Sequence, residues 1–540
     1  MAPSRDGRRS LIGASVAIAL AVALTAPAVA APIGHVAWTH DQRAWVSSAG
    51  IAAVNGDATP DLILGAGDRN AFVVRCLPAG NPASSINHLA DTASPGLAGL
   101  TALDGRDGSR LWNVNWATET VQGLSTPSPA RERFTLLYQS DVGDADGDGV
   151  KDVLVSRATH DKDAGDRVYM NANTTGGTNT MALHSASTGA PVWQRSTPVP
   201  DGNFDIVTVD PFSVGNRRLG LLTTVRIGNT PTYNAQSTTE LVSLDPGSPP
   251  SSLATVYDEP DTMTSAVVTE RAGAAIVVLS HIRMKEWDYN HAVDFVALRV
   301  SDQGAVPAAS ELWRRRGSGG LPVGDFPTYI AGDRVITVQG NDTRPGKLNG
   351  VAAYSLSTGE QLWRTPVYSG QGRGPSMLRD VDGDGVEELV AASAYGYAPA
   401  ADYGYEGSVP AQPQPPKVFV LDAATGAVRW AVSDVAGKFS PQRLSTADVD
   451  GDGAPEVLMA GMLRDGTTCG GSQDDQGVVS VLDGKTGAIE CRWPTERVAW
   501  ALTAANVDGI TGDEVMAAMA GGRTYAFTNA QPGCGALSGP

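Results

Sequence analysis

Basic residues are scarce in this sequence. The 540 residues contain 40 Lys and Arg against 58 Asp and Glu, which gives a formal net charge of −18, and no run rich in Lys or Arg follows the first ten residues. Binding to nucleic acid or to an anionic membrane surface depends on clustered positive charge. We therefore expect no nucleic acid and no lipid surface among the partners.

Cysteines and catalytic motifs are also few. Only four Cys are present, with no C-x-x-C pair and no Cys/His cluster, so a zinc site is not expected. The chain contains no G-x-S-x-G and no H-E-x-x-H, and its seven His are scattered. These absences favour a protein without catalytic activity but leave the question open.

Long apolar runs are absent except at the N-terminus. Arg5, Arg8 and Arg9 precede an apolar run over residues 11–26, and Ala28-Val29-Ala30 matches an A-x-A cleavage site. We predict a signal peptide over residues 1–30 and a secreted, extracellular mature chain over residues 31–540 that does not span a membrane. A membrane anchor is the alternative, and the adjacent arginines leave open general secretion or twin-arginine export.

Glycine, by contrast, is abundant, with 62 residues, and it marks a recurring turn followed by Trp. The cleanest copy runs from Leu421 to Trp430. Further copies end at Trp112, Trp193 and Trp363, one copy has Cys491 at the Trp position, and weaker copies occur at 244–247 and 301–313. An apolar strand that enters Leu-Asp, turns on Gly and leaves towards Trp is typical of a β-hairpin, because Gly supplies the positive φ of a tight turn. The Trp is expected to pack on a neighbouring repeat.

An acidic loop followed by an apolar run precedes each hairpin. The best copies are 144–152, 380–388 and 448–456; degenerate copies are 53–61, 506–514 and 210–218; and tight turns replace the loop at 271–273 and 332–334. Each of these eight units reads as four antiparallel strands, which is a propeller blade. The sequence therefore predicts an all-β protein, a single β-propeller domain of eight four-stranded antiparallel blades, with seven blades as the alternative. The strand at His35 to Trp38 is expected to complete the last blade and close the ring.

The acidic loops have the composition of calcium sites. Calcium prefers several hard oxygen ligands, and each of the three best loops places carboxylates at positions 1, 3, 5 and 9 and a backbone carbonyl at position 7. The predicted ligands are Asp144, Asp146, Asp148, Val150 and Asp152; Asp380, Asp382, Asp384, Val386 and Glu388; and Asp448, Asp450, Asp452, Ala454 and Glu456. An EF-hand is disfavoured, because it needs a Glu at position 12 and flanking helices.

Two further loops are expected to bind calcium more weakly. One keeps Asn55, Asp57 and Asp61 but has Ala53 at position 1, and the other keeps Asn506, Asp508 and Glu514 but has Ile510 at position 5. We therefore expect three calcium ions and up to five. The loop predicted at 210–218 ends in Arg218, whose positive charge should exclude calcium.

The three best loops resemble the FG-GAP repeat of integrin α-subunit propellers and the related VCBS-type repeats of secreted bacterial proteins. The Trp hairpins are similar to the PQQ-type propeller repeat. The resemblance implies calcium in the loops and Trp residues that dock blade on blade, but it implies no particular activity. A quinone-dependent dehydrogenase is disfavoured, because several blades lack a clean Trp motif and adjacent cysteines are absent.

Three long variable segments, 67–96, 157–178 and 393–417, and a fourth at 282–291 are expected on the face opposite the acidic loops. Exposed aromatic residues on loops suit recognition of sugars or protein surfaces, although packing within their own loops is the alternative. The candidate ligand-face residues are Tyr395, Tyr397, Tyr403, Tyr405, Trp287, Tyr289 and His160. The sequence thus favours a monomeric, secreted, calcium-binding propeller that binds a carbohydrate or an extracellular protein. A polysaccharide lyase on the same scaffold is the alternative.

The even number of cysteines in an exported chain predicts two disulfides. Of the three pairings, we favour Cys469–Cys491 and Cys76–Cys534. The first pair lies in one repeat, and the second joins the first repeat to the end of the last, which are neighbours in a closed ring.

Overall fold

The protein is described by a computed structural model. The described residues are 35–42, 45–67, 99–116, 132–141, 143–160, 177–199, 203–228, 235–245, 247–260, 262–271, 273–283, 293–302, 307–316, 328–339, 350–365, 376–393, 417–433, 439–463, 477–495, 499–519 and 522–528. They form strands and turns without a helix, and they belong to one compact unit, residues 32–540. Among them, no helix is long and apolar enough to cross a membrane.

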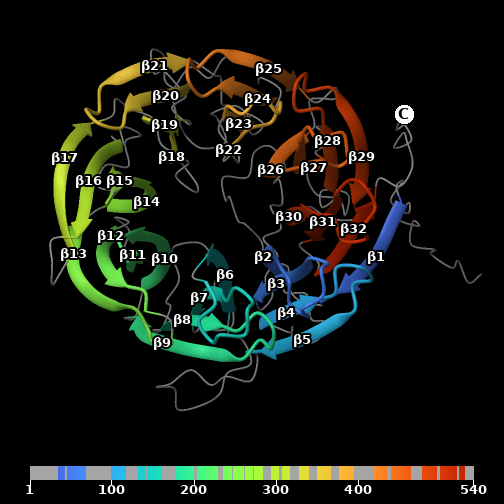
Figure 1. The fold of residues 1–540 in the computed structure, drawn as a ribbon, viewed down its shortest axis with the longest axis horizontal. Coiled ribbons are helices and arrows are strands. Elements are labelled where there is room, and N and C mark those ends of the chain that lie inside the picture. Colours follow the sequence, from blue (N-terminus) through green and yellow to red (C-terminus); the bar gives the residue numbers. More distant parts are fainter. Residues whose placement is uncertain are drawn as a thin grey trace, which may run out of the picture. The chain divides into compact units, whose positions relative to one another are not determined.

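The strands form eight four-stranded antiparallel sheets, so the predicted eight-bladed propeller is confirmed (Figure 1). Blade 1 contains β2 (Trp45–Ala52), β3 (Asp61–Gly67), β4 (Gly99–Leu103) and β5 (Arg110–Asn115). Blade 2 contains β6 (Glu132–Asp141), β7 (Val153–His160), β8 (Gly177–His184) and β9 (Pro191–Val199). Blade 3 contains β10 (Asn203–Val214), β11 (Arg217–Gly228), β12 (Ala235–Ser243) and β13 (Ser251–Pro260). Blade 4 contains β14 (Thr262–Arg271), β15 (Ala274–Arg283), β16 (Val293–Asp302) and β17 (Pro307–Arg316).

The remaining four blades follow the same order. Blade 5 contains β18 (Thr328–Ala331), β19 (Arg334–Gln339), β20 (Gly350–Ser355) and β21 (Gln361–Thr365). Blade 6 contains β22 (Ser376–Arg379), β23 (Glu388–Ser393), β24 (Lys417–Asp422) and β25 (Val428–Ser433). Blade 7 contains β26 (Phe439–Ala447), β27 (Glu456–Leu463), β28 (Gly477–Leu482) and β29 (Ile489–Thr495). Blade 8 contains β30 (Ala499–Ala505), β31 (Glu514–Met519), β32 (Arg523–Thr528) and β1 (His35–Asp41).

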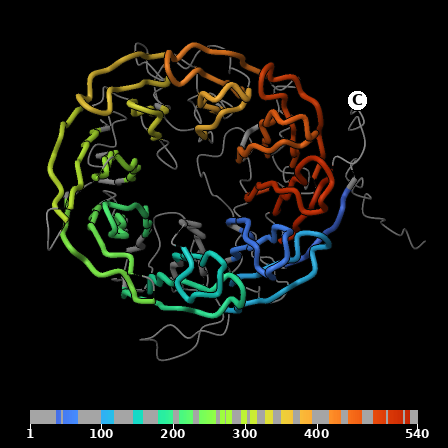
Figure 2. The backbone as a smooth tube through the Cα atoms, in the orientation of Figure 1, coloured from blue at the N-terminus to red at the C-terminus, as the bar shows by residue number. Residues whose placement is uncertain are grey.

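The N-terminal strand closes the ring, as predicted. β1 pairs antiparallel with β32, and Trp38 lies opposite Ala526. In the backbone trace the blue start of the described chain therefore runs beside its red end (Figure 2). The pairing gives blade 8 its fourth strand and removes an unpaired sheet edge.

The acidic loops join the first and second strands of a blade, and the Gly hairpins join the third and fourth. Because successive connections in an antiparallel blade alternate between its two ends, the loop and the hairpin of one blade lie at the same end. Hydrogen bonds between them confirm this: in blade 1 the Asn55 amide lies 3.4 Å from Asp104, and Arg106 donates to Thr59.

The predicted degenerate loop at 210–218 is wrong. Asp210 lies within β10, and β10 pairs with β11 without interruption from Asn203–Gly228 to Val214–Arg217. The third and fifth positions of the supposed loop are Phe212 and Val214, which are buried in the core between blades 3 and 4 instead of offering ligands. Their burial favours strand over loop, so blade 3 turns on two residues, as blades 4 and 5 do.

Trp residues dock six of the eight blades on the next, as the resemblance implied, whereas blades 3 and 7 have Tyr257 and Cys491 at this position. The indole Nε1 of Trp430 in blade 6 donates to the carbonyl of Gly484 in blade 7 at 2.8 Å, and its ring lies on Gly487 of the same hairpin. Gly487 has φ +72°, and a Cβ there would lie 2.6 Å from the ring. Glycine is therefore required both for the turn and for the approach of the indole. The contact between the indole ring and the hairpin glycine of the next blade recurs for Trp38, Trp112, Trp313 and Trp363.

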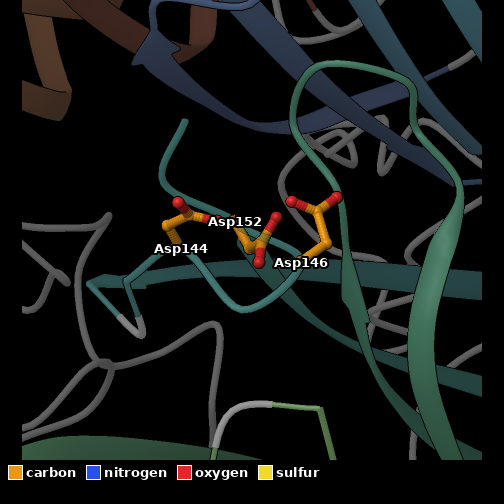
Figure 3. A group of neighbouring side chains, drawn as sticks. All are labelled: Asp144, Asp146 and Asp152. Atoms are coloured by element: carbon orange, nitrogen blue, oxygen red, sulfur yellow. The ribbon is translucent and has the colours of Figure 1, made fainter. Parts of the chain in front are cut away.

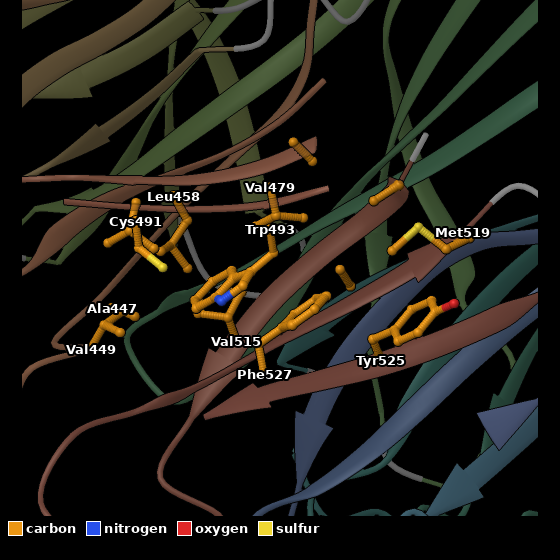
Figure 4. Close-up of a cluster of buried hydrophobic side chains, with 14 residues drawn as sticks. Ala447, Val449, Leu458, Val479, Cys491, Trp493, Val515, Met519, Tyr525 and Phe527 are labelled. Atoms are coloured by element: carbon orange, nitrogen blue, oxygen red, sulfur yellow. The ribbon is translucent and has the colours of Figure 1, made fainter. Parts of the chain in front are cut away.

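Blade 7 contacts blade 8 through a different residue, because it has Cys491 at the Trp position. Trp493, two residues later on the same face of β29, is 1% exposed and stacks on Phe527 of blade 8 at 4.8 Å between ring centroids (Figure 4). The sequence pattern did not predict this role for Trp493. The two-residue period of a strand is the signal that could have found it.

Candidate metal centre

The acid at the ninth position organises each of the five acidic loops. It is buried, and one of its oxygens accepts a hydrogen bond from the backbone N–H of the second position. These pairs are Ala145 to Asp152 at 2.6 Å, Val381 to Glu388 at 3.1 Å, Val449 to Glu456 at 2.7 Å, Val54 to Asp61 at 2.9 Å and Val507 to Glu514 at 2.8 Å. Because all five loops share this hydrogen bond, their backbones follow the same path although their other side chains differ.

The acid at the first position is held by the backbone of the same loop. Asp144 accepts hydrogen bonds from the N–H groups of Gly147 at 2.6 Å and Gly149 at 2.9 Å. Both glycines have positive φ, of 82° and 89°, which turns their N–H groups inward at no steric cost. Asp380 is held in the same way by Gly383 and Gly385, each at 2.8 Å.

Three loops bring three carboxylates together. In each triad, one ligand atom per residue lies within 4.8 Å of the others, and the members come from positions 1, 3 and 9: Asp144, Asp146 and Asp152; Asp380, Asp382 and Glu388; Asp448, Asp450 and Glu456. Figure 3 shows the blade 2 triad with its carboxylates gathered at one side of the loop. The sequence-predicted metal loops therefore do converge their acids, and each triad could hold a metal ion.

The predicted ligands at positions 5 and 7 lie outside these triads. Asp148 accepts a hydrogen bond from the Ser187 hydroxyl and another from the Val150 N–H. Asp384 lies 3.4 Å from Arg429, and Asp452 accepts from the Ala454 N–H at 2.7 Å. Their part in binding, and that of the carbonyls of Val150, Val386 and Ala454, stays a prediction.

The triads are electrostatically unfavourable without a cation. Asp152 is 4% exposed, and its Oδ1 has no hydrogen-bond partner among the described residues. Burial, and then the charges of the neighbouring aspartates, raise the pKa of Asp152. The same causes raise the pKa of Glu388 to about 7 and that of Glu456 to about 8. A divalent cation suits this donor set, because it supplies the missing partner of a buried oxygen and offsets the mutual repulsion.

The two weaker loops contribute only two carboxylates each. In blade 1, the second oxygen of Asp61 accepts from the Gly105 N–H at 3.2 Å, and Asp57 pairs with Arg106 at 2.8 Å. In blade 8, position 5 is Ile510, which is 60% exposed and whose carbonyl accepts a hydrogen bond from the Asn506 amide. Protein groups thus take up donor atoms that a metal ion would need.

A second candidate site is a cavity of about 500 Å³ lined by the first strands of blades 3 to 6. Asp210, Thr269, Tyr329 and Arg379 are among its lining residues. Burial raises the pKa of Asp210 to about 7. The sequence did not predict this cavity, because Asp210 was placed in a loop instead of a strand.

Most of the other predicted site residues fall outside the described part of the chain. This holds for the signal peptide, for Cys76, Cys469 and Cys534, and for the ligand-face residues Trp287, Tyr289, Tyr395, Tyr397, Tyr403 and Tyr405. His160 ends β7, and its side chain is also outside the description. Cys491 is buried on β29, at the position predicted for it.

Comparison with known proteins finds only distant structural similarity. No family model and no curated protein matches the chain. Among solved structures, it is similar to the V. cholerae biofilm matrix protein Bap1, with 12% identity over 92% of both chains and a TM-score of 0.35. It is also similar to the WD40 domain of SCAP from fission yeast, with 9% identity over 91% of this chain and 98% of the other, and a TM-score of 0.34. At these scores the propeller assignment rests on the strand pairing itself.

Proposed function

We propose that this chain is a secreted, calcium-stabilised β-propeller that acts as a binding or adhesion module for a carbohydrate or an extracellular protein. The observation that carries the proposal is the convergence of three carboxylates in each of three matched loops, with a fully or nearly buried acid at the ninth position. Hard oxygen donors from one short loop favour calcium over softer metals. The predicted signal peptide supports the extracellular location, where millimolar calcium can saturate modest sites.

The binding role rests on the architecture around these loops. A closed ring of eight blades holds each blade by its neighbours, so connections between strands can vary without loss of the core. The longest connections, 67–96, 157–178 and 393–417, join the second and third strands of blades 1, 2 and 6, at the opposite end of the blade from the acidic loops. We therefore propose that the acidic loops stabilise the fold and that the opposite face of the ring binds the ligand.

The calcium part is tested on the mature chain, residues 31–540. Calcium should raise the melting temperature of chelator-treated protein in a saturable way, and magnesium at the same concentration should raise it less, because Mg²⁺ tolerates this irregular oxygen set poorly. Equal effects of the two ions would contradict the assignment to calcium.

The binding part is tested by a glycan array together with a polysaccharide-degradation assay. Retention of a glycan without turnover supports the binding module, whereas unsaturated sugar products would replace it with a lyase. Shortening residues 395–405 to a Gly-Ser turn should leave the melting temperature unchanged and weaken retention. If retention instead depends on the acidic loops of a still-folded protein, the ligand face is assigned wrongly.

A further inference from the structure

Each outer strand carries a β-bulge one residue before its Trp or the residue that replaces it. The register of the third and fourth strands skips one residue at this point in all eight blades. The bulged residues, from blade 8 through blade 7, are Ala37, Leu111, Val192, Val256, Leu312, Leu362, Arg429 and Glu490. Bulges re-aim a side chain and are frequent beside functional sites. Six of these residues are apolar, and the two charged ones belong to blades 6 and 7, which both carry complete acidic loops.

Arg429 reaches from its bulge into the acidic loop of its own blade. Its guanidinium contacts Asp382, lies 3.4 Å from Asp384 and forms an ion pair with the fully buried Glu388 at 3.0 Å. A further ion pair at 3.2 Å joins it to Asp422 in the hairpin. Arg429 thus places positive charge against the third, fifth and ninth positions of the loop, where a metal ion would be held.

Glu490 occupies the same position in blade 7 with the opposite charge. Its side chain is exposed at this bulge, and the carboxylates of Asp483, Asp450 and Asp452 act on it as neighbouring like charges. Asp513 of blade 8 adds a carboxylate at the other side of the loop, since its Oδ2 accepts from the Asp448 N–H at 3.2 Å. The blade 7 loop therefore gathers extra negative charge where the blade 6 loop gathers a cation.

In blade 2 the bulged residue is apolar. This residue, Val192, packs in the apolar cluster between blades 2 and 3. The free Oδ1 of Asp152 in this loop corresponds to the Glu388 oxygen that faces Arg429 in blade 6. Neither oxygen accepts a hydrogen bond from the described residues, but Arg429 forms an ion pair with the blade 6 oxygen at 3.0 Å, whereas in blade 2 the Arg218 guanidinium lies beside Gly143, at the start of the loop.

We infer that the bulged residue selects the cation of each acidic loop: Arg429 is the resident cation of loop 380–388, which therefore binds no calcium, while loops 144–152 and 448–456 bind calcium. The inference rests on the calcium binding proposed above. A tethered guanidinium is present at a high effective concentration, and a dication would have to break several charge-assisted contacts to displace it. Glu490 instead strengthens the field that attracts calcium to blade 7.

The test is the number of calcium ions bound per chain, measured by equilibrium dialysis of the folded mature protein at a calcium concentration that saturates the tight sites. Arg429→Gln should bind one more ion than the wild type, because it frees the loop. Arg429→Lys keeps the charge and should match the wild type, and Glu490→Arg should bind one ion fewer. An unchanged count in both Arg429→Gln and Glu490→Arg would overturn the inference.

A second pair of variants serves if Arg429→Gln does not fold. Asp450→Asn should lower the count by one, whereas Asp382→Asn, in a loop that holds its own cation, should leave it unchanged. An equal loss in the two variants would show that loop 380–388 binds calcium and would overturn the inference while the proposed function stands. A wild-type chain that binds no calcium at all would instead overturn the proposed function.

Discussion

Blades 3 to 5 and the remaining blades close their first two strands in different ways. In blades 3 to 5, which we term the turn blades, a two-residue turn joins the first two strands. In blade 4 the pairing runs unbroken from Thr262–Arg283 to Arg271–Ala274. In blades 1, 2, 6, 7 and 8, the loop blades, a nine-residue loop with a buried acid fills the same place. The connection between the first two strands is thus a short paired turn in one part of the ring and a loop around a buried carboxyl group in the other.

The difference indicates which blades depend on the ionic conditions of the solution. Backbone hydrogen bonds and apolar packing change little with ionic conditions, whereas buried carboxylates depend on cations and on pH. Calcium should therefore act on the loop blades, above all on blades 2 and 7, and leave the turn blades largely unaffected. Arg429 should make blade 6 less dependent on calcium than blades 2 and 7.

The largest expected effect is that of removing calcium. Chelation should lower the melting temperature of the mature chain by several degrees or more, because an ion at a hundred times its dissociation constant contributes about 3 kcal/mol. Differential scanning fluorimetry with and without chelator measures the shift, and magnesium addition serves as the control. A melting curve that chelator leaves unchanged would remove the distinction between loop and turn blades.

Two glycine substitutions compare blade docking with turn strain. Gly487 and Gly273 have nearly equal φ, +72° and +71°, but a Cβ at Gly487 would meet Trp430, whereas a Cβ at Gly273 has nothing within 4 Å. Both variants to Ala should lose roughly 1–2 kcal/mol to left-handed strain. Gly487→Ala should lose about 1–3 kcal/mol more, because the indole must move. Equal losses in denaturant unfolding would show that the Trp contact contributes nothing.

Removing one metal ligand should cost less than removing all calcium. Asp146→Ala breaks the blade 2 triad, so it should abolish one bound ion and lower the melting temperature by a fraction of the chelator effect. The matched control is Asp333→Ala, which removes an exposed acid in the turn of blade 5 that pairs with Arg271 at the surface. The control should change stability by less than about 1 kcal/mol. If the two variants behave alike, the blade 2 triad holds no stabilising ion.

Much of the fold was predictable because its signals are local. Gly turns, Trp positions and acidic loops recur in the sequence, and they predicted eight blades and the closing role of the strand at His35 to Trp38. The position of Asp210 within a strand was not predictable in this way. Its acidic side chain resembles the start of a loop, but Phe212 and Val214 are buried against blade 4, and this packing favours a strand.

The candidate site was predictable in its triads but not in its surroundings. Spacing predicted which acids converge, but the direction of Arg429 and Glu490 depends on a bulge that only strand register reveals. Aligning the hairpin copies does show charge at these two positions where Leu111, Val192, Leu312 and Leu362 stand in others. The pairings Cys469–Cys491 and Cys76–Cys534 stay predictions, which peptide mapping without reduction can check.

The smallest expected effect concerns pH in a turn blade. The pKa of Asp210 is raised to about 7, so the folded state holds a proton there that the unfolded state releases near its ordinary value of 3.8. Stability from this group is therefore lost as pH rises from about 4 to 7. Asp210→Asn removes the penalty and should be more stable than the wild type at pH 8 by an amount of order 1 kcal/mol, with no gain at pH 4. A gain that does not vary with pH would contradict this assignment.

The most direct test of the account is hydrogen exchange of the mature chain with and without calcium. Peptides covering 143–160 and 448–463 should exchange faster when calcium is removed, because they contain the metal loops of blades 2 and 7. Peptides covering 203–228 and 262–283, in the turn blades, should keep their protection, and 376–393 in blade 6 should change little because Arg429 remains in place. Uniform loss of protection across all these peptides, or no change in any of them, would contradict a calcium requirement confined to particular loops.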